Sequence, residues 1–372
     1  MKTSIVLGTQ FGDEGKGKTV SYLCSISDNH KKIVIRFSGG QQAGHNVKTI
    51  NGLSHVHSNF GCGTLFGVPS YFSEHCTIYP TTIYREKTVL EEKGVIPELI
   101  IHPLVNVTTP YDVAYNRLTE LKNNHGSCGL GVSATMKRNI ETGFKLYGVD
   151  LQNRKLLYQK LNKIFEYYLN RLDDDDRSRY ISLVDIEEES FYDALNNLMF
   201  NIKNYDYLKD NYEDFIFEGS QGILLDMNHG IFPNVTYSNT TSKNALEICK
   251  NLGISLLDIN IYYVTRCYQT RHGNGWMSNQ ENIDLINTHD EINVYNQWQK
   301  EFKIGEIDYD LLNYSLDVDN IYSNGCNKNL VVTCLDQRPG FTFDYNKIYH
   351  NFKIKYMSGS ADTLMFQTDY HF

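Results

Sequence analysis

Short apolar runs, separated by glycine or polar turns, recur along the chain and predict buried β-strands. Residues 4–7 form the first run and residues 32–37 the second, with a glycine-rich loop and an expected helix start at 19–24 between them. Strand, glycine loop, helix and strand within about forty residues is the pattern of a parallel α/β sheet. Four later runs repeat the theme, at residues 99–101, 215–217, 259–264 and 330–333. We therefore expect an α/β protein with a mainly parallel central sheet and helical excursions.

A different periodicity marks the middle of the chain. Apolar residues between positions 157 and 172 recur at helical spacing, which predicts a long helix covering the core. Four consecutive aspartates, Asp173–Asp176, follow, and we expect a solvated acidic turn there rather than a metal site. The polar segment 278–293 is expected to be a surface excursion. Because no internal repeat or linker interrupts the sequence, we expect one continuous domain over residues 1–372.

Composition and charge narrow the class of protein. Of the 372 residues, 41% are hydrophobic and 21% charged, which supports a large core and excludes a disordered or fibrous protein. The formal net charge of −9 argues against a general nucleic-acid-binding protein, because phosphate backbones attract an excess of Lys and Arg. The sequence contains no long apolar run, and its start, MKTSIVLG, lacks a signal-peptide core, so we expect a cytoplasmic protein without membrane contact. The eight cysteines are scattered without a CxxC pair and are expected to be reduced thiols.

The loop after the first apolar run carries the strongest chemical signal. Residues 8–19 read GTQFGDEGKGKT and, from Gly12 onward, fit the phosphate-loop pattern GxxxxGK[ST]. Glycines let backbone N–H groups approach phosphate oxygens, and the lysines Lys16 and Lys18 add positive charge. We therefore expect this loop to bind phosphate groups.

Two carboxylates, Asp13 and Glu14, are unexpected in such a loop. They would repel a polyphosphate unless a cation neutralises them or a proton transfer needs them. The pair therefore indicates Mg²⁺ binding, general-base chemistry, or both.

The loop resembles the signature loop of the adenylosuccinate synthetase family, whose members join L-aspartate to a purine nucleoside monophosphate at the expense of GTP. Three further segments resemble family motifs in the same order along the chain. They are GGQQAGHNV at 39–47 (family GGxNAGHTV), the segment 217–239 (family EGAQGxxLDxxHGxxPxVTSSN) and YQTRHGNG at 268–275 (family YxTRVGxG). The resemblance thus covers most of the chain.

The resemblance assigns roles to residues of one active site. Asp13 takes the place of the base that removes the purine N1 proton, His45 that of the acid that donates to the transferring phosphoryl group, and Gln221 that of the amide that steadies charge on O6. For Mg²⁺ it implies Asp13 and the backbone carbonyl of Gly44. The phosphate donor is expected to contact Gly12, Glu14, Gly15, Lys16, Gly17, Lys18, Asp336, Ser358 and Gly359. The nucleotide substrate is expected to contact Gln42, Ser127, Cys128, Arg138 and Thr236, with Arg138 reaching the nucleotide of the neighbouring subunit in a homodimer.

Three segments depart from the family pattern. Cys128 stands where the loop GTTGxGIG has a threonine, and a thiol is a weaker donor, so backbone amides or Ser127 must hold more of the phosphate. The arginine-rich aspartate loop is replaced by residues 297–308, whose cations Lys300 and Lys303 cannot reproduce a bidentate guanidinium grip. The guanine-reading pattern TKLD appears as TCLD, where Asp336 can still accept from guanine and favours GTP over ATP.

Three functions follow from these observations. We expect a Mg²⁺-dependent, GTP-driven ligase that forms adenylosuccinate from IMP and L-aspartate, as a homodimer. The alternative within the family is a ligase acting on dGMP with ATP or GTP, as in the phage diaminopurine pathway. Enzymes of that branch carry Ser or Thr in place of the loop aspartate, so the presence of Asp13 favours IMP. The alternative outside the family is a phosphate-loop NTPase without ligase activity, against which the set Asp13, His45 and Gln221 argues.

Overall fold

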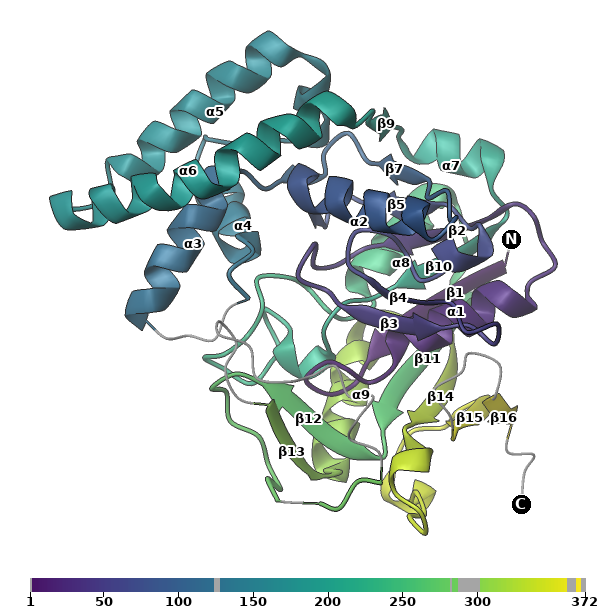
Figure 1. Cartoon of the computed structure of the whole chain (residues 1–372). Coiled ribbons are helices and arrows are strands. Elements are labelled where there is room, and N and C mark those ends of the chain that lie inside the picture. Colours follow the sequence, from purple (N-terminus) through teal and green to yellow (C-terminus); the bar gives the residue numbers. More distant parts are fainter. Residues whose placement is uncertain (1, 124–127, 282, 287–301, 360–365, 369–372) are drawn as a thin grey trace.

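The computed structural model describes residues 2–123, 128–281, 283–286, 302–359 and 366–368 (Figure 1). Its main strands are β1 Lys2–Gly8, β2 Lys32–Arg36, β5 Ser70–Phe72, β7 Leu99–Ile101, β9 Asn201–Ile202, β10 Asp214–Glu218, β11 Ile259–Arg266, β14 Asn327–Thr333, β15 Ile354–Ser358 and β16 Phe366–Thr368. Within the described part of the chain they form one ten-stranded sheet in the order β16-β15-β14-β11-β1-β10-β2-β5-β7-β9. Neighbouring strands are parallel, except that β16 runs antiparallel to β15. The predicted fold class is confirmed.

Six small strands form three separate pairs. They are β3 His45–Lys48 with β4 Ser54–His57, β6 Thr77–Ile78 with β8 Asn106–Val107, and β12 Tyr268–His272 with β13 Phe302–Glu306. The helices are α1 Lys16–Ile26, α2 Pro80–Glu92, α3 Pro110–Asn123, α4 Val132–Glu141, α5 Arg154–Leu169, α6 Asp174–Asn197, α7 Tyr205–Asn211, α8 Lys243–Leu252 and α9 Tyr309–Ser323.

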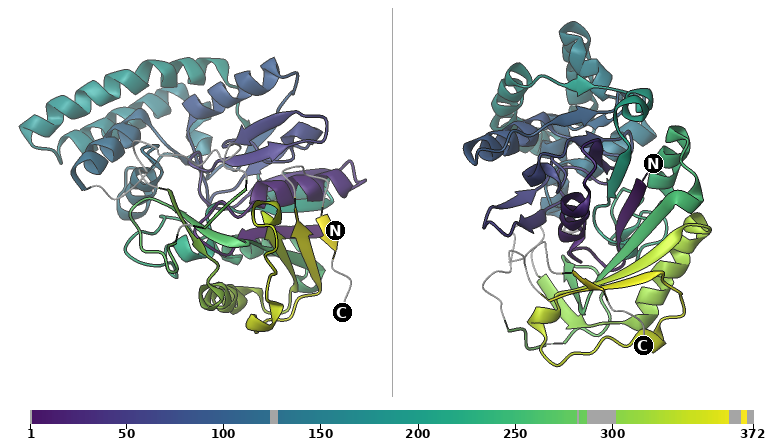
Figure 2. Two further views of the ribbon diagram at one scale, coloured as in Figure 1. Left: turned by 60° about the horizontal axis from the view of Figure 1, so that its bottom comes forward. Right: turned by 90° about the vertical axis from the view of Figure 1, so that its right-hand side faces the viewer.

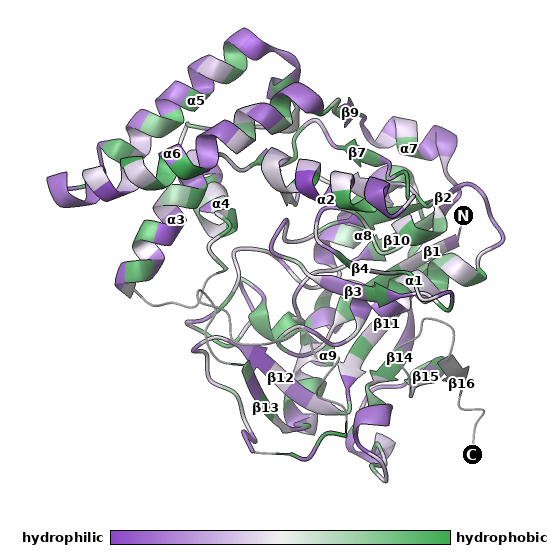
Figure 3. Ribbon diagram, viewed as in Figure 1, coloured by the Kyte–Doolittle hydropathy of each residue, from purple (hydrophilic) through white to green (hydrophobic). Residues whose placement is uncertain are grey.

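The six predicted apolar runs lie in the strands β1, β2, β7, β10, β11 and β14. Consecutive apolar residues are buried there because both faces of the sheet are covered. Within β1, Ile5 and Leu7 join the core cluster that contains residues of α8 and α9, whereas Val6 joins the cluster that contains residues of α1. All three side chains are fully buried. Figure 3 shows the resulting concentration of hydrophobic residues on the central strands.

Helices α3, α4, α5 and α6 form a lobe beside the β7–β9 end of the sheet (Figures 1 and 2). The single long helix predicted up to residue 172 ends at Leu169, and the acidic run begins α6 instead of forming a turn. The Asp173 carboxylate caps α6 by accepting from the backbone N–H of Asp176 at 2.9 Å. Carboxylates in a first helical turn are stabilised by the helix dipole. The expectation of a turn was therefore wrong, whereas Asp173, Asp174 and Asp175 are exposed to solvent as expected.

The parallel direction of the strands places the family-type motifs at one edge of the sheet. The carboxyl ends of β14, β11, β1, β10 and β2, which are consecutive in the sheet, all lie there. The phosphate loop follows β1, the EGSQG segment ends β10, and the GGQQAGH segment follows β2. Ligands of open α/β sheets bind at the carboxyl ends of the strands, where the loops after two neighbouring strands lead to opposite faces of the sheet.

Two further expectations can be compared with the structure. All eight cysteines are free thiols, and five of them are buried. Within the described residues, each helix is too short or too polar to span a bilayer.

Candidate active site

The loop between β1 and α1 is built around the carboxylate of Glu14. This side chain is fully buried and accepts hydrogen bonds from the backbone N–H groups of Gln10, at 3.0 Å, and Gly12, at 2.9 Å. The Lys16 ammonium lies 2.5 Å from its other oxygen. Gly12 and Gly15 have φ values of 102° and 96°, which only glycine adopts without strain. The side chain of Glu14 therefore stabilises the loop and does not face a ligand. Only the backbone N–H of Glu14 can make the predicted phosphate contact.

Asp13 is the carboxylate that faces outward from this loop. Its backbone has φ 62°, an unusual value for a non-glycine residue, and its carbonyl accepts from Nε of Arg266 at the end of β11. Its Oδ2 lies 3.1 Å from Nε2 of His272 on β12, and the side chain is 25% exposed. Burial raises the pKa of Asp13, but the hydrogen bond from His272 and the charges of Arg266 and Lys16 outweigh burial and hold this pKa below its ordinary value. The carboxylate is therefore ionised at neutral pH and can accept a proton.

Gln221 lies on the neighbouring loop, directly after β10. A methyl group placed on Gly12 would lie 3.8 Å from Cα of Gln221, so the two loops are in contact. Gln221 has φ 50°, and its Oε1 accepts from the Ser220 hydroxyl at 2.8 Å. Among the described non-glycine residues, positive φ occurs only at Asp13, Gln221, Asn279 and Cys334. Strained backbone of this kind concentrates at functional sites, and three of these four positions lie in the predicted motifs.

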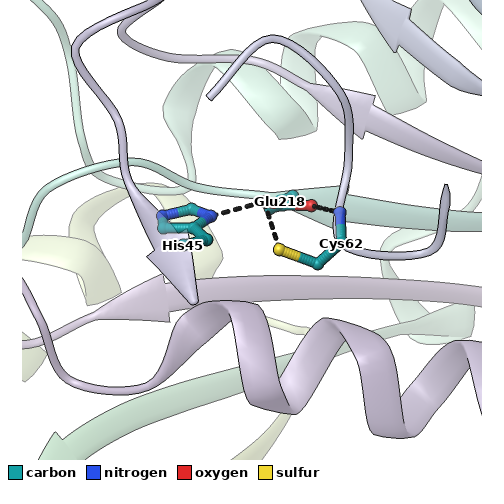
Figure 4. A group of neighbouring side chains, drawn as sticks. All are labelled: His45, Cys62 and Glu218. Atoms are coloured by element: carbon teal, nitrogen blue, oxygen red, sulfur yellow. Dashed lines mark hydrogen bonds and ion pairs between the residues drawn. The ribbon is translucent and has the colours of Figure 1, made fainter. Parts of the chain in front are cut away.

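His45 is oriented by a buried carboxylate, Glu218, at the end of β10 (Figure 4). Its Nδ1 lies 2.5 Å from Oε1 of Glu218, which also accepts from the thiol of Cys62 at 3.1 Å, while Oε2 accepts from the Cys62 backbone N–H at 2.8 Å. The Arg36 guanidinium lies 3.7 Å from the same carboxylate. These contacts orient the imidazole ring through Nδ1. The second ring nitrogen, Nε2, is not involved in the contact with Glu218.

The protonation states of this pair follow from burial and charge. Burial raises the pKa of Glu218, but the His45 hydrogen bond and the Arg36 charge outweigh it and bring the pKa to about 2. Burial lowers the pKa of His45 and exceeds the opposite effect of Glu218. We infer an ionised Glu218 that accepts the Nδ1–H of a neutral His45.

The N-terminus of α1 lies against this histidine. A methyl group on Gly17 would lie 2.7 Å from Cβ of His45 and 2.9 Å from Sγ of Cys62. Such distances exclude any larger residue at position 17, so Gly17 permits the close approach of helix and histidine. The positive end of a helix, which attracts phosphate, is thereby placed beside His45.

The predicted phosphate-donor residues come from three strand ends. Lys18, in the first turn of α1, donates a hydrogen bond to the hydroxyl of Ser358 at the end of β15, and both residues are buried. Asp336 follows β14, and one of its carboxylate oxygens accepts from the Gln337 amide at 2.9 Å. Gly359 is exposed beside Ser358. The phosphate loop, Ser358 and Asp336 thus belong to the same edge of the sheet.

The predicted nucleotide contacts are placed in part. Gln42 is half-buried, and its amide nitrogen and oxygen are themselves buried without a hydrogen-bond partner among the described residues. A polar ligand group would satisfy them. Thr236 is half-buried and donates its backbone N–H to Leu225. Burial raises the pKa of the Cys128 thiol to about 11, so it is protonated at neutral pH. Ser127 lies outside the described residues.

A cleft of about 550 Å³ opens between α4 and the loop that follows β10. Its lining includes Asn106, Met136, Ser238, Asn239 and Lys243. Ser238 belongs to the family-type motif, and its hydroxyl accepts from the backbone N–H of Gly39 at 2.9 Å. The cleft therefore adjoins the loop that carries Gln42.

Arg138 does not have the position that a contact with another subunit requires. Its guanidinium is 1% exposed and forms a two-pronged ion pair with Asp112, at 2.8 and 2.9 Å. It also donates to the carbonyls of Val107 and Phe144 and to the side chain of Asn139. Because its donors are used inside the chain, the prediction that Arg138 reaches a neighbouring nucleotide was wrong.

The predicted aspartate site is described only at Lys303. This residue lies on β13, opposite Arg271 of β12, and donates to the carbonyl of Gly275 at 2.8 Å. His272 follows Arg271 on the same strand, so Lys303 lies close to the partner of Asp13. Lys300 lies outside the described residues.

Sequence reasoning missed three residues at the site: Glu218, Arg36 and His272. Glu218 lies within a recognised motif, and its position after a buried strand was a signal that it could face the site. His272 occupies the Val position of the family motif YxTRVGxG, and that substitution was the available signal. Arg36 gave no signal, because its role depends on a contact with a distant strand.

The chain is similar to known proteins in both sequence and fold. A family profile for adenylosuccinate synthetase matches residues 5–355. The adenylosuccinate synthetase of Pseudomonas putida strain W619 is 32% identical over 283 residues, which cover 74% of this chain and 64% of that protein. The chain thus spans less than two thirds of the length of such curated relatives.

Two solved structures share the fold. The fully ligated adenylosuccinate synthetase from Plasmodium falciparum superposes with a TM-score of 0.68 at 22% identity, covering 92% of this chain and 78% of that chain. The succinoaminodeoxyadenylate synthetase of cyanophage S-2L, bound to dGMP and to dATP as energy donor, superposes with a TM-score of 0.64 at 15% identity. That second match covers 99% of this chain and 95% of the phage chain.

Proposed function

The chain belongs to the adenylosuccinate synthetase family, and from this premise we propose that it is a GTP-driven ligase that joins IMP to L-aspartate. One observation carries the proposal. An ionised Asp13 and the amide of Gln221 lie on adjoining loops, and both residues have left-handed backbone conformations. His45 and the N-terminus of α1 lie at the same edge of the sheet. This combination supplies a base, a donor for a developing oxyanion and a phosphate site.

The proposed chemistry has two steps. In the first, Asp13 accepts the N1 proton of IMP while O6 attacks the γ-phosphorus of GTP, so the bond from phosphorus to the GDP oxygen breaks and a 6-phosphoryl nucleotide forms. The Gln221 amide donates to O6 as its charge develops. In the second, the neutral amine of L-aspartate attacks C6, the C6–O6 bond breaks and phosphate leaves with O6. The new nitrogen substituent loses one proton to solvent, which gives adenylosuccinate.

His45 is proposed to donate a hydrogen bond to the phosphoryl group in transfer. The lowered pKa of His45 and the ionised Glu218 beside it indicate a neutral imidazole in the unliganded protein, with its proton on Nδ1 toward Glu218. A second proton is therefore needed on Nε2, and the approach of phosphate oxygens would favour it. Ligand binding is then expected to draw a proton from solvent.

Mg²⁺ is proposed as the metal cofactor, and the nature of the donors suits it. Mg²⁺ prefers oxygen ligands and substrate phosphates. Asp13 offers an ionised, partly exposed carboxylate, and Gly44 is exposed in the loop that leads to His45. These two residues would hold the ion, which when bound neutralises charge on the triphosphate.

The remaining partners are proposed from the family. We propose L-aspartate as the amino donor, with Lys303 and Lys300 near its carboxylates, and a cytoplasmic homodimer as the working assembly. One domain is proposed for the whole chain, because the residues of this single site extend from Gly12 to Asp336.

A second candidate substrate is dGMP. The match to the cyanophage enzyme covers 99% of this chain and 95% of that chain, whereas the match to the Pseudomonas putida synthetase covers 74% of this chain and 64% of that protein. Against this, the chain has Asp13, the residue expected to act as base toward IMP.

Substrate choice is tested by chromatography coupled to mass spectrometry. The purified protein, Mg²⁺ and L-aspartate are combined with GTP or ATP and with IMP or dGMP. We expect adenylosuccinate from IMP with GTP as the better donor. Formation of the succino-adduct from dGMP alone would replace IMP by dGMP and leave the ligase assignment intact.

A further inference from the structure

A second group of ligand-type side chains includes two histidines on β4, the strand that pairs with β3, where His45 lies. His55 and His57 occupy alternate positions of β4, and both face inward while their neighbours Ser54 and Val56 are exposed. Glu86, on the buried face of α2, lies opposite them. The three residues are 6%, 0% and 8% exposed, respectively, so a helix and a strand meet around two imidazoles and a carboxylate.

The spacing of the three groups suits a metal ion. Nε2 of His55 lies 3.3 Å and Nδ1 of His57 lies 4.0 Å from the same oxygen of Glu86. The three potential ligand atoms all lie within 4.8 Å of one another. A tetrahedral zinc with nitrogen and oxygen ligands at about 2.0–2.1 Å places neighbouring ligand atoms about 3.3–3.4 Å apart. The observed spacing is close to that requirement and needs only a small inward movement of His57.

His57 supplies an independent observation. Neither of its ring nitrogens has a hydrogen-bond partner among the described residues, although the side chain is fully buried. A buried polar atom without a hydrogen-bond partner destabilises the folded protein. Burial also lowers the pKa of His57 to about 4, so the ring is neutral at pH 7 and has a lone pair to offer. A ligand for Nδ1 would satisfy this atom without displacing an existing bond.

Hydrogen bonds from neighbouring residues orient the carboxylate of Glu86. Glu86 accepts backbone N–H bonds from Ser58, at 3.1 Å, and Asn59, at 2.6 Å, and a further bond from the Asn59 amide. Such second contacts orient ligating carboxylates in metal sites. On the other side, the ammonium of Lys93 lies 3.2 Å from Nδ1 of His55. Lys93 is exposed and can turn into solvent, which frees Nδ1 to carry the proton once Nε2 binds a metal.

We propose that His55, His57 and Glu86 form a binding site for a divalent transition-metal ion of the Zn²⁺ class, separate from the Mg²⁺ proposed at the phosphate loop. Two imidazoles and one carboxylate are the ligands that Zn²⁺ accepts, whereas Mg²⁺ prefers oxygen alone. The site joins β4 to α2, and His57 pairs with His45 across the β3–β4 hairpin. A bound ion would therefore stiffen the strand that positions His45.

A second cluster, His45 with Cys62 and Glu218, has similar spacing but is less suited to a metal. The thiol of Cys62 has a pKa raised well above its ordinary value by burial and by Glu218, so it resists the deprotonation that a metal requires. The two clusters can be separated experimentally, because only one contains a thiol.

Cobalt(II) serves as the optical probe. Chelator-treated protein is titrated with Co²⁺ in the presence of excess Mg²⁺, which occupies oxygen-rich sites. We expect one equivalent to bind with the visible absorption of low-symmetry Co²⁺ and without the near-ultraviolet band of thiolate ligation, and Zn²⁺ to displace it. The variants His55→Gln and Glu86→Gln should weaken binding at least about tenfold, since loss of one ligand removes a third of the protein donors.

Matched variants decide the assignment. His350→Gln alters a histidine that pairs with Asp317 on the surface, and Cys62→Ser alters the thiol cluster; both should bind Co²⁺ like the wild type. Circular dichroism checks that each variant is folded. If a variant is unfolded, the titration of the wild type still tests the proposal. Failure of the wild type to bind Co²⁺ or Zn²⁺ would overturn the proposal, as would binding that survives His55→Gln and disappears in Cys62→Ser.

Discussion

Nε2 of His272 lies 3.1 Å from Oδ2 of Asp13, so a residue at the Val position of the family motif contacts the carboxylate that we propose as the base. The contact joins β12 to the phosphate loop. It also contributes to the lowered pKa of Asp13, whose burial alone would have the opposite effect. His272 is thus a polar partner of the residue that we propose for proton transfer.

The first prediction concerns Asp13 itself. Asp13→Asn keeps the shape of the side chain but cannot accept the N1 proton. We expect kcat for ligation to fall about 10²–10⁴-fold, the usual contribution of a general base. Steady-state kinetics of the variant, compared with Asp317→Asn at the surface, checks the effect; turnover within a few-fold of wild type would remove Asp13 from the base role.

The second prediction concerns the pH profile. His272→Val removes a hydrogen bond that stabilises ionised Asp13, so the pKa of Asp13 should rise. Activity requires the ionised form and is lost as pH falls through this pKa. The acidic limb of kcat/KM against pH should therefore move to higher pH in the variant. An acidic limb at the wild-type position would show that His272 does not influence the base.

The third prediction concerns the proton on His45. The neutral imidazole must gain a proton to donate through Nε2, so binding of IMP with a non-hydrolysable GTP analogue at pH 7.5 should take up about one proton per site. Calorimetry in buffers of different ionisation enthalpy measures this uptake. His45→Gln should bind the ligands with less proton uptake, and equal uptake in both proteins would contradict the assignment.

The fourth prediction concerns Arg138 as a structural residue. Removing it leaves Asp112 as an unpaired buried charge, and breaking such a pair costs about 3–5 kcal/mol. Urea unfolding of Arg138→Ala should show a loss of this size. Arg177→Ala, which removes an exposed ion pair with Asp174, should cost less than about 1 kcal/mol. A small loss in Arg138→Ala together with a raised KM for nucleotide would restore the substrate-binding role.

The sequence predicted the sheet well and the lobe less well, for a physical reason. Strands such as β1 and β11 are buried on both faces, so apolar residues such as Ile5, Val6 and Leu7 follow one another without polar residues between them. The start of α6 depends on local capping by Asp173, and composition alone suggested a turn. Periodicity and composition describe burial, whereas a cap depends on the geometry of one side chain.

The sequence motifs located the candidate site, but they did not predict which of its side chains contact one another. Asp13, Gln221 and His45 were found because each belongs to a recognisable loop. The inward orientation of Glu14 and the buried pairing of Arg138 with Asp112 arise from contacts that the order of residues does not reveal. His272 was missed for the same reason, because its partner is distant in sequence.

The central claim is that O6 of the purine is phosphorylated and then displaced. It is tested most directly with [6-¹⁸O]IMP, Mg²⁺, GTP and L-aspartate, by mass spectrometry of the inorganic phosphate. The account predicts adenylosuccinate together with phosphate that carries the ¹⁸O atom, one for each product formed. Phosphate containing only solvent and GTP oxygen, released without an aspartate adduct, would contradict the account and identify the protein as a nucleotide hydrolase.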